Sequence, residues 1–172
     1  FFEQKFIYDS YSCRNGKGVH KARRRFERFA GKSSKNNTRT AWILKCDVRK
    51  FFASIDHGVL FKILLRHGVD SETLWLLSRV VESFSSGEAG KGLPLGNLTS
   101  QLLVNVYMNE FDQFIKHKLR AKFYIRYADD FVLIHHDKRV LENYLPEIRN
   151  FLEAELLLKL HPGKVSLKTH AS

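Results

Sequence analysis

The stretch FYIRYADDFVLIHH, residues 123–136, holds two short runs of aromatic and β-branched residues around an acidic centre. The runs cover residues 123–127 and 131–135, and this composition is typical of β-strands. The intervening Ala-Asp-Asp predicts a three-residue turn, so the stretch predicts a hairpin. Aspartate is common in turns because its side chain bonds nearby backbone, but Asp129 and Asp130 together repel and raise each other's pKa. A bound cation would remove that cost.

Two other regions predict strands. TAWILKCDVRKFF, residues 40–52, has the character of a buried strand that ends near Asp47. LLKLHPGKVSLK, residues 157–168, predicts two strands about a Pro-Gly turn, with Gly163 at the positive φ of a type II turn. In such a sheet the first strand can lie beside the central hairpin. Asp47 is therefore expected to approach the acidic pair at residues 129–130.

Helical spacing of apolar residues fills most of the remaining chain. Helices are predicted over about residues 20–30, from the N-cap Asp56 to Gly68, from Asp70 or Ser71 to about Phe84, along the stripe Leu103, Tyr107, Phe111 and Phe114 or Ile115, and over 137–156. Loops are expected over residues 31–37 and 85–97. Pro146 should kink or split the last helix because proline lacks an N–H donor.

This order of elements predicts the fold class. A strand, helices, a hairpin, a helix and further strands form an α+β split βαβ arrangement, an antiparallel sheet with helices packed on one face. The chain has 172 residues, of which 44% are hydrophobic, and this suits one domain with a proper core. Both ends are expected to continue into a longer protein.

The charge of the chain is strongly asymmetric. The net charge is +11, and residues 1–45 hold twelve Lys or Arg against three acids, a net +9. The remaining 127 residues hold seventeen bases against fifteen acids, a net +2. Arg23, Arg24 and Arg25 begin a basic helix among Gly, Ser and Asn residues, a mixture that suits phosphate contacts. A merely solvated face is the alternative.

Membrane and disulfide-based classes are disfavoured. No run approaches the roughly 20 apolar residues that span a membrane, and the start lacks the order of a signal peptide. Cys13 and Cys46 have neither metal-site spacing nor a disulfide framework. We therefore expect a cytoplasmic protein without a membrane partner. His135 and His136 predict a strand end rather than a metal site, because no other ligand lies at a suitable spacing.

Three carboxylates in one place indicate divalent metal. Hard oxygen ligands such as Asp47, Asp129 and Asp130 favour Mg²⁺ or Mn²⁺. Two such ions a few ångströms apart clamp the attacking and leaving oxygens of an in-line phosphoryl displacement. One ion would lower the pKa of a primer 3′-hydroxyl, and the other would hold a triphosphate. The sequence thus predicts a site for two Mg²⁺ ions, with Mn²⁺ as the alternative.

Several motifs resemble those of reverse transcriptases. YADD at 127–130, DVRKFF at 47–52 and GLPLGNLTSQ at 92–101 match the polymerase motifs of this family, in the right order. YDSYSCRNGKGVHKA, residues 8–22, is similar to the fingers segment of bacterial members, and LLLKLHPGKV, residues 156–165, to a later lysine motif of the palm.

The resemblance implies a right-hand polymerase that copies RNA into DNA. Residues 1–40 would be a basic part of the fingers and residues 41–172 the palm, while the upstream fingers segment and the thumb would be absent from this chain. The implied partners are template RNA, primer or cDNA, and deoxynucleoside triphosphates. A catalytically inactive RNA-binding protein on a polymerase scaffold is the alternative, and the intact acidic trio argues against it.

Carried over residue by residue, the resemblance assigns the catalytic groups. Asp47 and Asp129 look like the principal metal ligands, and Asp130 is their acidic partner. Lys164 matches the lysine that protonates the leaving pyrophosphate, although a solvated turn lysine is the alternative. Phe52 falls where the family places a bulky gate beneath the incoming sugar, which would exclude a 2′-hydroxyl.

Other carried-over residues would contact substrate or template. Phe52 could instead be ordinary core, as its neighbour Phe51 is expected to be. Tyr127 resembles the residue that touches the primer end, or is one more aromatic strand residue. The positions that would contact template are Arg14, Lys17, His20, Arg23 and Arg24, although any surface base could do so.

The loop before the long helix points to a subfamily. Intron-encoded and retroviral members usually carry Gln where this chain has Leu95, and bacterial intron members carry Pro where it has Gln101. Leu95, Gly96 and Gln101 are the substrate-binding candidates of this loop. The pattern resembles diversity-generating retroelements, which copy RNA with errors at adenines and imply a basic accessory protein as a partner. Group II intron, retron and defence-associated enzymes are the alternatives.

Overall fold

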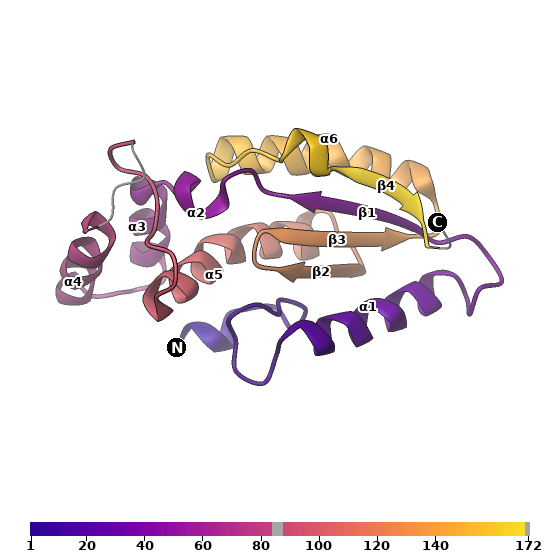
Figure 1. The fold of residues 1–172 in the computed structure, drawn as a ribbon, viewed down its shortest axis with the longest axis horizontal. Helices are drawn as coiled ribbons and strands as arrows, with labels where there is room; N and C mark the ends of the chain where they lie inside the picture. The colour runs from indigo at the N-terminus through magenta and orange to yellow at the C-terminus, as the bar shows by residue number, and fades with distance from the viewer. Residues whose placement is uncertain (84–87, 171–172) are drawn as a thin grey trace.

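A four-stranded antiparallel sheet in the order β2-β3-β1-β4 organises the molecule (Figure 1). The computed structural model describes residues 1–83 and 88–170. The strands are β1 (Trp42–Asp47), β2 (Phe123–Tyr127), β3 (Asp130–His135) and β4 (Ser166–Thr169). Helices connect β1 to the β2–β3 hairpin and the hairpin to β4. This is the split βαβ arrangement, so the predicted α+β fold class is confirmed.

The helices largely follow the predicted pattern. They are α1 (Val19–Ser33), α2 (Phe51–Ser54), α3 (His57–Arg66), α4 (Ser71–Glu82), α5 (Leu98–Gln113) with a π-helical turn (Phe114–Lys118), and α6 (Lys138–Glu155), with 3₁₀ turns at Phe2–Gln4 and Pro162–Lys164. Asp56 and Asp70 cap α3 and α4 as expected, each accepting a backbone N–H. The predicted end of α4 at Phe84 and loop residues 85–87 lie outside the described residues.

Two local expectations differ from the structure, and one short helix was not predicted. The predicted loop over 31–37 begins later, because α1 continues to Ser33, and the short helix α2 was not predicted. Pro146 does not split α6, which runs unbroken from Lys138 to Glu155. Pro146 and Glu142, whose carbonyl loses its helical partner, both lie on the exposed side of α6, where water can satisfy that carbonyl.

The hairpin loop is also shorter than predicted. Asp130 is already paired in β3, opposite Tyr127 of β2 and Asp47 of β1, so only Ala128 and Asp129 form the loop. A central strand has a partner on both sides, and this extends its pairing to the residue nearest the loop. Ala128 adopts φ +54°, in the left-handed region that a tight loop requires here.

The two faces of the sheet carry different cores. Because side chains alternate along a strand, Phe131 and Leu133 of β3 join the main core with α5 and α6, while Val132 and Ile134 face the other side. There α1 packs on β2 and β3 through Phe29 and its neighbours (Figure 1). The helices were predicted to pack on one face of the sheet. This is correct for α5 and α6, but α1 packs on the opposite face.

The segment before β4 differs from the predicted hairpin. Only β4 is a strand; Pro162–Lys164 forms a 3₁₀ turn, and Gly163 does not have a positive φ. The reason is that residues of this segment form hydrogen bonds other than those of a hairpin. The N–H of His161 donates to the Asp47 carbonyl at 2.8 Å, and the N–H of Gly163 donates to the His161 ring at 3.2 Å. These bonds place Lys164 beside the end of β1.

Candidate active site

The residues that carry the three predicted carboxylates are neighbours where β1 ends and the β2–β3 hairpin turns. Asp47, the last residue of β1, lies opposite Asp130, the first residue of β3. Asp129 belongs to the hairpin loop, and its carbonyl accepts the N–H of Val48 at 3.3 Å. The sequence expectation that Asp47 approaches the acidic pair is therefore confirmed. Two strands fix these positions, and this suits the exact placement that catalytic groups require.

Two lysines partly compensate this concentration of negative charge. Lys164 Nζ lies 3.0 Å from Asp47 Oδ2, and Lys45 Nζ lies 3.8 Å from Asp130 Oδ1. The hydrogen bond to Asp47 and then the charge of Asp47 raise the pKa of Lys164. Burial raises the pKa of Asp129, and the charges of Asp47 and Asp130 add to this effect. The site therefore favours an additional cation.

The donor chemistry fits a hard divalent cation, although the side chains are not gathered around one point. Among residues 1–83 and 88–170, no three His, Cys, Asp or Glu side chains form a group that could hold a metal ion. Asp47 and Asp130 are each directed to a lysine. Carboxylate oxygens are the ligands that Mg²⁺ prefers, and a change of side-chain rotamer at either residue would release it from its lysine.

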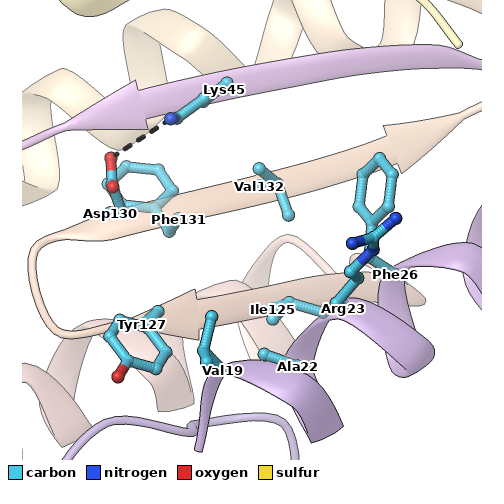
Figure 2. A pocket seen from close by; sticks show the side chains of 10 residues that line it. All are labelled: Val19, Ala22, Arg23, Phe26, Lys45, Ile125, Tyr127, Asp130, Phe131 and Val132. Carbon is cyan, nitrogen blue, oxygen red and sulfur yellow. Dashed lines mark ion pairs between the residues drawn. The ribbon is translucent and has the colours of Figure 1, made fainter.

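An open groove of about 400 Å³ begins at this acidic end of the sheet and runs between α1 and strands β2 and β3. Figure 2 shows Asp130 and Tyr127 at one end and Arg23 with Phe26 at the other. The groove is lined by Val19, Ala22, Arg23, Phe26, Lys45, Ile125, Tyr127, Asp130, Phe131 and Val132. Tyr127, which is 40% exposed, is therefore accessible next to the carboxylates.

The predicted sugar gate lies on α2, shortly after Asp47. Phe51 is buried in the main core, as expected, and Phe52 packs against that core while remaining partly exposed. The Phe52 carbonyl accepts the N–H of Leu93 at 2.9 Å, so α2 is tied to the loop that precedes α5. Phe52 is thus partly accessible beside the loop that precedes α5, a placement compatible with a gate.

The loop before α5 presents an apolar side chain to solvent. Leu95 is 71% exposed, and Gly96 adopts φ +86°, a conformation that favours glycine. Asn97 then caps α5 by accepting the N–H of Ser100. Gln101 lies in the first turn and is half-buried. The predicted substrate-binding loop is thus accessible at Leu95, and its backbone is set by neighbouring residues.

The predicted nucleic-acid contacts divide into two groups. The side chain of Arg14 is only 5% exposed and bonds Glu3 and the carbonyls of Ile7 and Ser10. The prediction that Arg14 contacts template is therefore not supported, because its guanidinium holds the N-terminal loop together. Lys17 donates to the Tyr8 carbonyl at 2.7 Å and lies over the Tyr8 ring.

The second group is exposed along α1. His20, Arg23 and Arg24 are exposed, although Arg23 pairs with Glu27. A concavity of about 460 Å³ is lined by Tyr8, Tyr11, Gly16, Lys17, Lys21, Arg24, Arg25 and Arg28. Arg25 is held by Asp9 at 2.7 Å. We call Lys21, Arg24 and Arg28 the basic stripe, because their spacing places them on one side of α1.

Sequence reasoning missed two residues of the site. Lys45 lies two positions before Asp47 on the same strand, so strict alternation along β1 could have placed both on one face. Arg126 precedes Tyr127 in the hairpin and is fully buried. An arginine amid strand residues offered no local sign of its partners.

None of the described helices has the length and apolar character needed to cross a membrane.

Comparison with known proteins gives a consistent result. The chain matches the family model described as "Reverse transcriptase (RNA-dependent DNA polymerase)" over residues 2–171. Protein YkfC of Escherichia coli is 28% identical, with 96% of this chain and 53% of YkfC covered. The group II intron-encoded protein LtrA of Lactococcus lactis is 22% identical, with 98% of this chain and 28% of LtrA covered.

Solved structures show the same fold. Apo telomerase from Candida tropicalis superposes with a TM-score of 0.71 at 11% identity, covering 98% of this chain and 35% of the telomerase chain. Telomerase from Candida albicans, in complex with a fragment of telomeric RNA, gives 0.67 at 12% identity, with 94% and 32% covered. The chain spans about half of YkfC and less than a third of LtrA.

Proposed function

This chain belongs to the reverse transcriptase family, and from that premise we propose that it acts in an RNA-directed DNA polymerase that extends a primer 3′-hydroxyl with deoxynucleotides. The observation that carries the proposal is the register that sets Asp47 opposite Asp130 with Asp129 beside them. We assign residues 1–40 to part of the fingers and residues 41–172 to the palm. The template RNA, the primer or cDNA, and the deoxynucleoside triphosphates are the proposed partners.

The carboxylates are proposed as the metal ligands. Asp47 and Asp129, with Asp130 beside them, would hold two Mg²⁺ ions, or Mn²⁺ in their place. When bound, such ions lower the pKa of a hydroxyl nucleophile and stabilise the charge on the transferring phosphoryl group. In this arrangement Lys45 keeps a positive charge next to Asp130.

The remaining residues act on the substrates. Lys164 is proposed to donate a proton from Nζ to the leaving pyrophosphate; its hydrogen bond to Asp47 raises its pKa, and its side chain is more than half exposed. Tyr127 would contact the primer end from the mouth of the groove. Phe52 would lie beneath the incoming sugar, and Leu95, Gly96 and Gln101 would lie near the nascent base pair.

Primer extension is the direct test. The full-length protein should extend oligo-dT on a poly-rA template in the presence of Mg²⁺ and dTTP, and excess EDTA should stop the reaction. A protein that binds the RNA–primer duplex but adds no nucleotide under any divalent cation would contradict the proposal. That outcome would favour the catalytically inactive RNA-binding alternative.

The basic stripe is proposed to follow the template backbone. Neutralising Lys21, Arg24 and Arg28 to Gln should weaken RNA binding and flatten its salt dependence, because each phosphate contact releases counterions on binding. The slope of log affinity against log salt should fall by about 2 for a single-stranded template, at about 0.7 per contact. Fluorescence anisotropy with labelled RNA at several salt concentrations measures this slope.

A matched triple variant controls for the loss of net charge. Lys62, Lys118 and Lys168 are exposed lysines outside α1, and their replacement by Gln removes the same charge from the protein. This control should leave the slope close to that of the parent protein. Equal slopes for the two triple variants would place the template on another surface.

We further propose the diversity-generating subtype, with a basic accessory protein as a partner. The support is the resemblance of the Leu95-Gly96 pattern, where intron-encoded and retroviral members usually carry Gln in place of Leu95, and the exposure of Leu95. An aliphatic side chain there removes hydrogen bonds that could check the nascent pair. The likeness to the intron-encoded protein LtrA favours the group II intron alternative, so the subtype needs its own test.

Leu95→Gln should reduce errors opposite template adenines. The gain should be modest, about 1–3 kcal/mol at most, as for other single-contact effects on selectivity. Stability should change little, because the exposed side chain is replaced by one of similar size. Sequencing cDNA copied from one RNA by both proteins measures the errors.

Leu98→Gln provides the control for this experiment, because it makes the same change at another exposed leucine, the first residue of α5. Its error spectrum should match that of the parent. If the parent protein already copies adenines as accurately as other bases, the diversity-generating assignment is wrong, and the intron or retron alternative takes its place.

A further inference from the structure

The hairpin that carries Asp129 rests on a guanidinium that the proposed chemistry does not use. Arg126 of β2 is 0% exposed and forms a two-pronged ion pair with Asp112 of α5, with Nε to Oδ1 and Nη2 to Oδ2 both at 2.8 Å. Asp112 is also fully buried and accepts the Tyr124 hydroxyl at 2.7 Å. Burial alone would lower the pKa of Arg126, but the charge and hydrogen bonds of Asp112 outweigh it and raise that pKa.

Arg126 uses its remaining donors on three further groups, of which one is again on α5. Nη2 donates to Ser10 Oγ at 3.0 Å, and Nη1 donates to Asn105 Oδ1 at 3.3 Å and to the carbonyl of Ala128 at 3.1 Å. A guanidinium has five N–H donors in a rigid planar fork, and all are engaged here. Because the fork is rigid, its bonds to α5 fix the direction of the bond to Ala128.

The bond to Ala128 reaches the point of the hairpin that most needs support. Ala128 has φ +54°, a conformation that is unfavourable for a residue with a Cβ atom. Its carbonyl is held by Arg126, and the next carbonyl, that of Asp129, is held by the N–H of Val48. Asp129 therefore lies between two fixed peptide groups, one tied to α5 and the other to the end of β1.

The N-terminal loop completes this support. The N–H of Arg126 donates to the Asp9 carbonyl at 3.0 Å, and the N–H of Tyr11 donates to the Arg126 carbonyl at 2.9 Å. Residues 9–11 thus bond to β2 at the edge of the sheet. Asn105 joins the same assembly, since its side chain donates to the Ser12 carbonyl. The loop, α5 and the hairpin meet at Arg126.

We propose that Arg126 is a positioning residue that holds the Ala128–Asp129 loop in its left-handed conformation and so sets the place of the Asp129 carboxylate. It acts through Ala128 and touches no reacting atom. The inference rests on the proposed polymerase function. The proposal predicts that a positive charge beside Asp112 is not sufficient to hold the Ala128–Asp129 loop in place. A lysine could pair with Asp112, but its compact ammonium lacks the fork that reaches Ala128 at the same time.

Two variants of the full-length protein separate positioning from stability. Arg126→Lys keeps the charge next to Asp112. The triple variant Arg126→Met, Asp112→Leu and Tyr124→Phe removes the buried polar groups together, and apolar replacement of a complete buried ion pair is often tolerated. Tyr107→Phe is the control, because it removes another buried hydrogen bond of α5, to the Leu156 carbonyl, far in sequence from the hairpin. Each protein is assayed below its thermal midpoint for kcat, KM for dTTP and affinity for the RNA–primer duplex.

In both test variants we expect kcat to fall by about 100-fold, the scale of loss from a displacement of about 1 Å at a reacting centre. In the same two variants, affinity for the RNA–primer duplex should stay within about threefold of the parent, because ground-state binding is preserved. The control Tyr107→Phe should keep kcat within about threefold of the parent. A folded variant of either kind with near-parental kcat would overturn the proposal. Failure of both to fold would also overturn it, by making Arg126 a requirement for folding only. An inactive parent protein would instead contradict the polymerase function.

Discussion

Asp47→Asn and Asp129→Asn are each expected to abolish primer extension by the full-length protein while leaving it folded. Each change removes one charge from the proposed metal site and hardly alters side-chain volume. Metal ions stabilise the transition state by several kcal/mol, so we expect kcat to fall by about a thousandfold or more, the equivalent of about 4 kcal/mol. Steady-state extension of oligo-dT on poly-rA, with circular dichroism to verify folding, measures both effects.

Asp137→Asn is the matched control. Asp137 caps α6 just beyond the end of β3 that is distant from Asp130, and asparagine is an equally good N-cap. This variant should retain the parental rate. Unchanged extension rates in either test variant would remove that carboxylate from the two-metal assignment.

Asp129→Asn should also stabilise the metal-free protein near neutral pH. The pKa of Asp129 is raised from 3.8 by burial and by the charges of Asp47 and Asp130, so the ionised form is disfavoured in the folded state. That cost is absent below pH 3.8, where the carboxyl is protonated in both states, and it develops as pH rises through the folded pKa. Thermal unfolding in EDTA should show a gain at pH 7 that shrinks toward pH 4.

Phe52→Val is expected to admit ribonucleotides. If the ring lies beneath the incoming sugar, a smaller side chain leaves room for the 2′-hydroxyl. The preference for dCTP over rCTP, taken as the ratio of kcat/KM values, should fall by about 10–200-fold, the equivalent of 1–3 kcal/mol. Phe52 packs on the main core but remains partly exposed, so the loss of stability should be small beside this effect.

The adjacent Phe51 provides a control of the same residue type. Phe51 is buried, and its ring lies against that of Phe52 at a centroid distance of 5.5 Å. Phe51→Val should lower the free energy of unfolding by about 2–3 kcal/mol through the cavity it leaves, without altering the choice of sugar. If both variants keep the parental preference, Phe52 is part of the core and not a gate.

The sequence by itself determined the elements whose causes are local. Apolar, β-branched and aromatic composition placed β1 and the hairpin, and Asp56 and Asp70 marked the starts of two helices, because a cap bonds backbone only three residues away. The position of Asp47 at the end of its strand then followed from the split βαβ order. Motifs in sequence order indicated the family before any geometry was known.

Only the tertiary structure decided which distant groups meet. Lys164 pairs with Asp47 across 117 residues because the chain before β4 bonds to the end of β1, where the sequence predicted a hairpin instead. The side chain of Arg14 is buried in the N-terminal loop, although the family resemblance implied a contact with template. Arg126 gathers residues from α5, the hairpin and the N-terminal loop. The partner of a charged side chain depends on packing between remote segments, and no local pattern in the sequence records that choice.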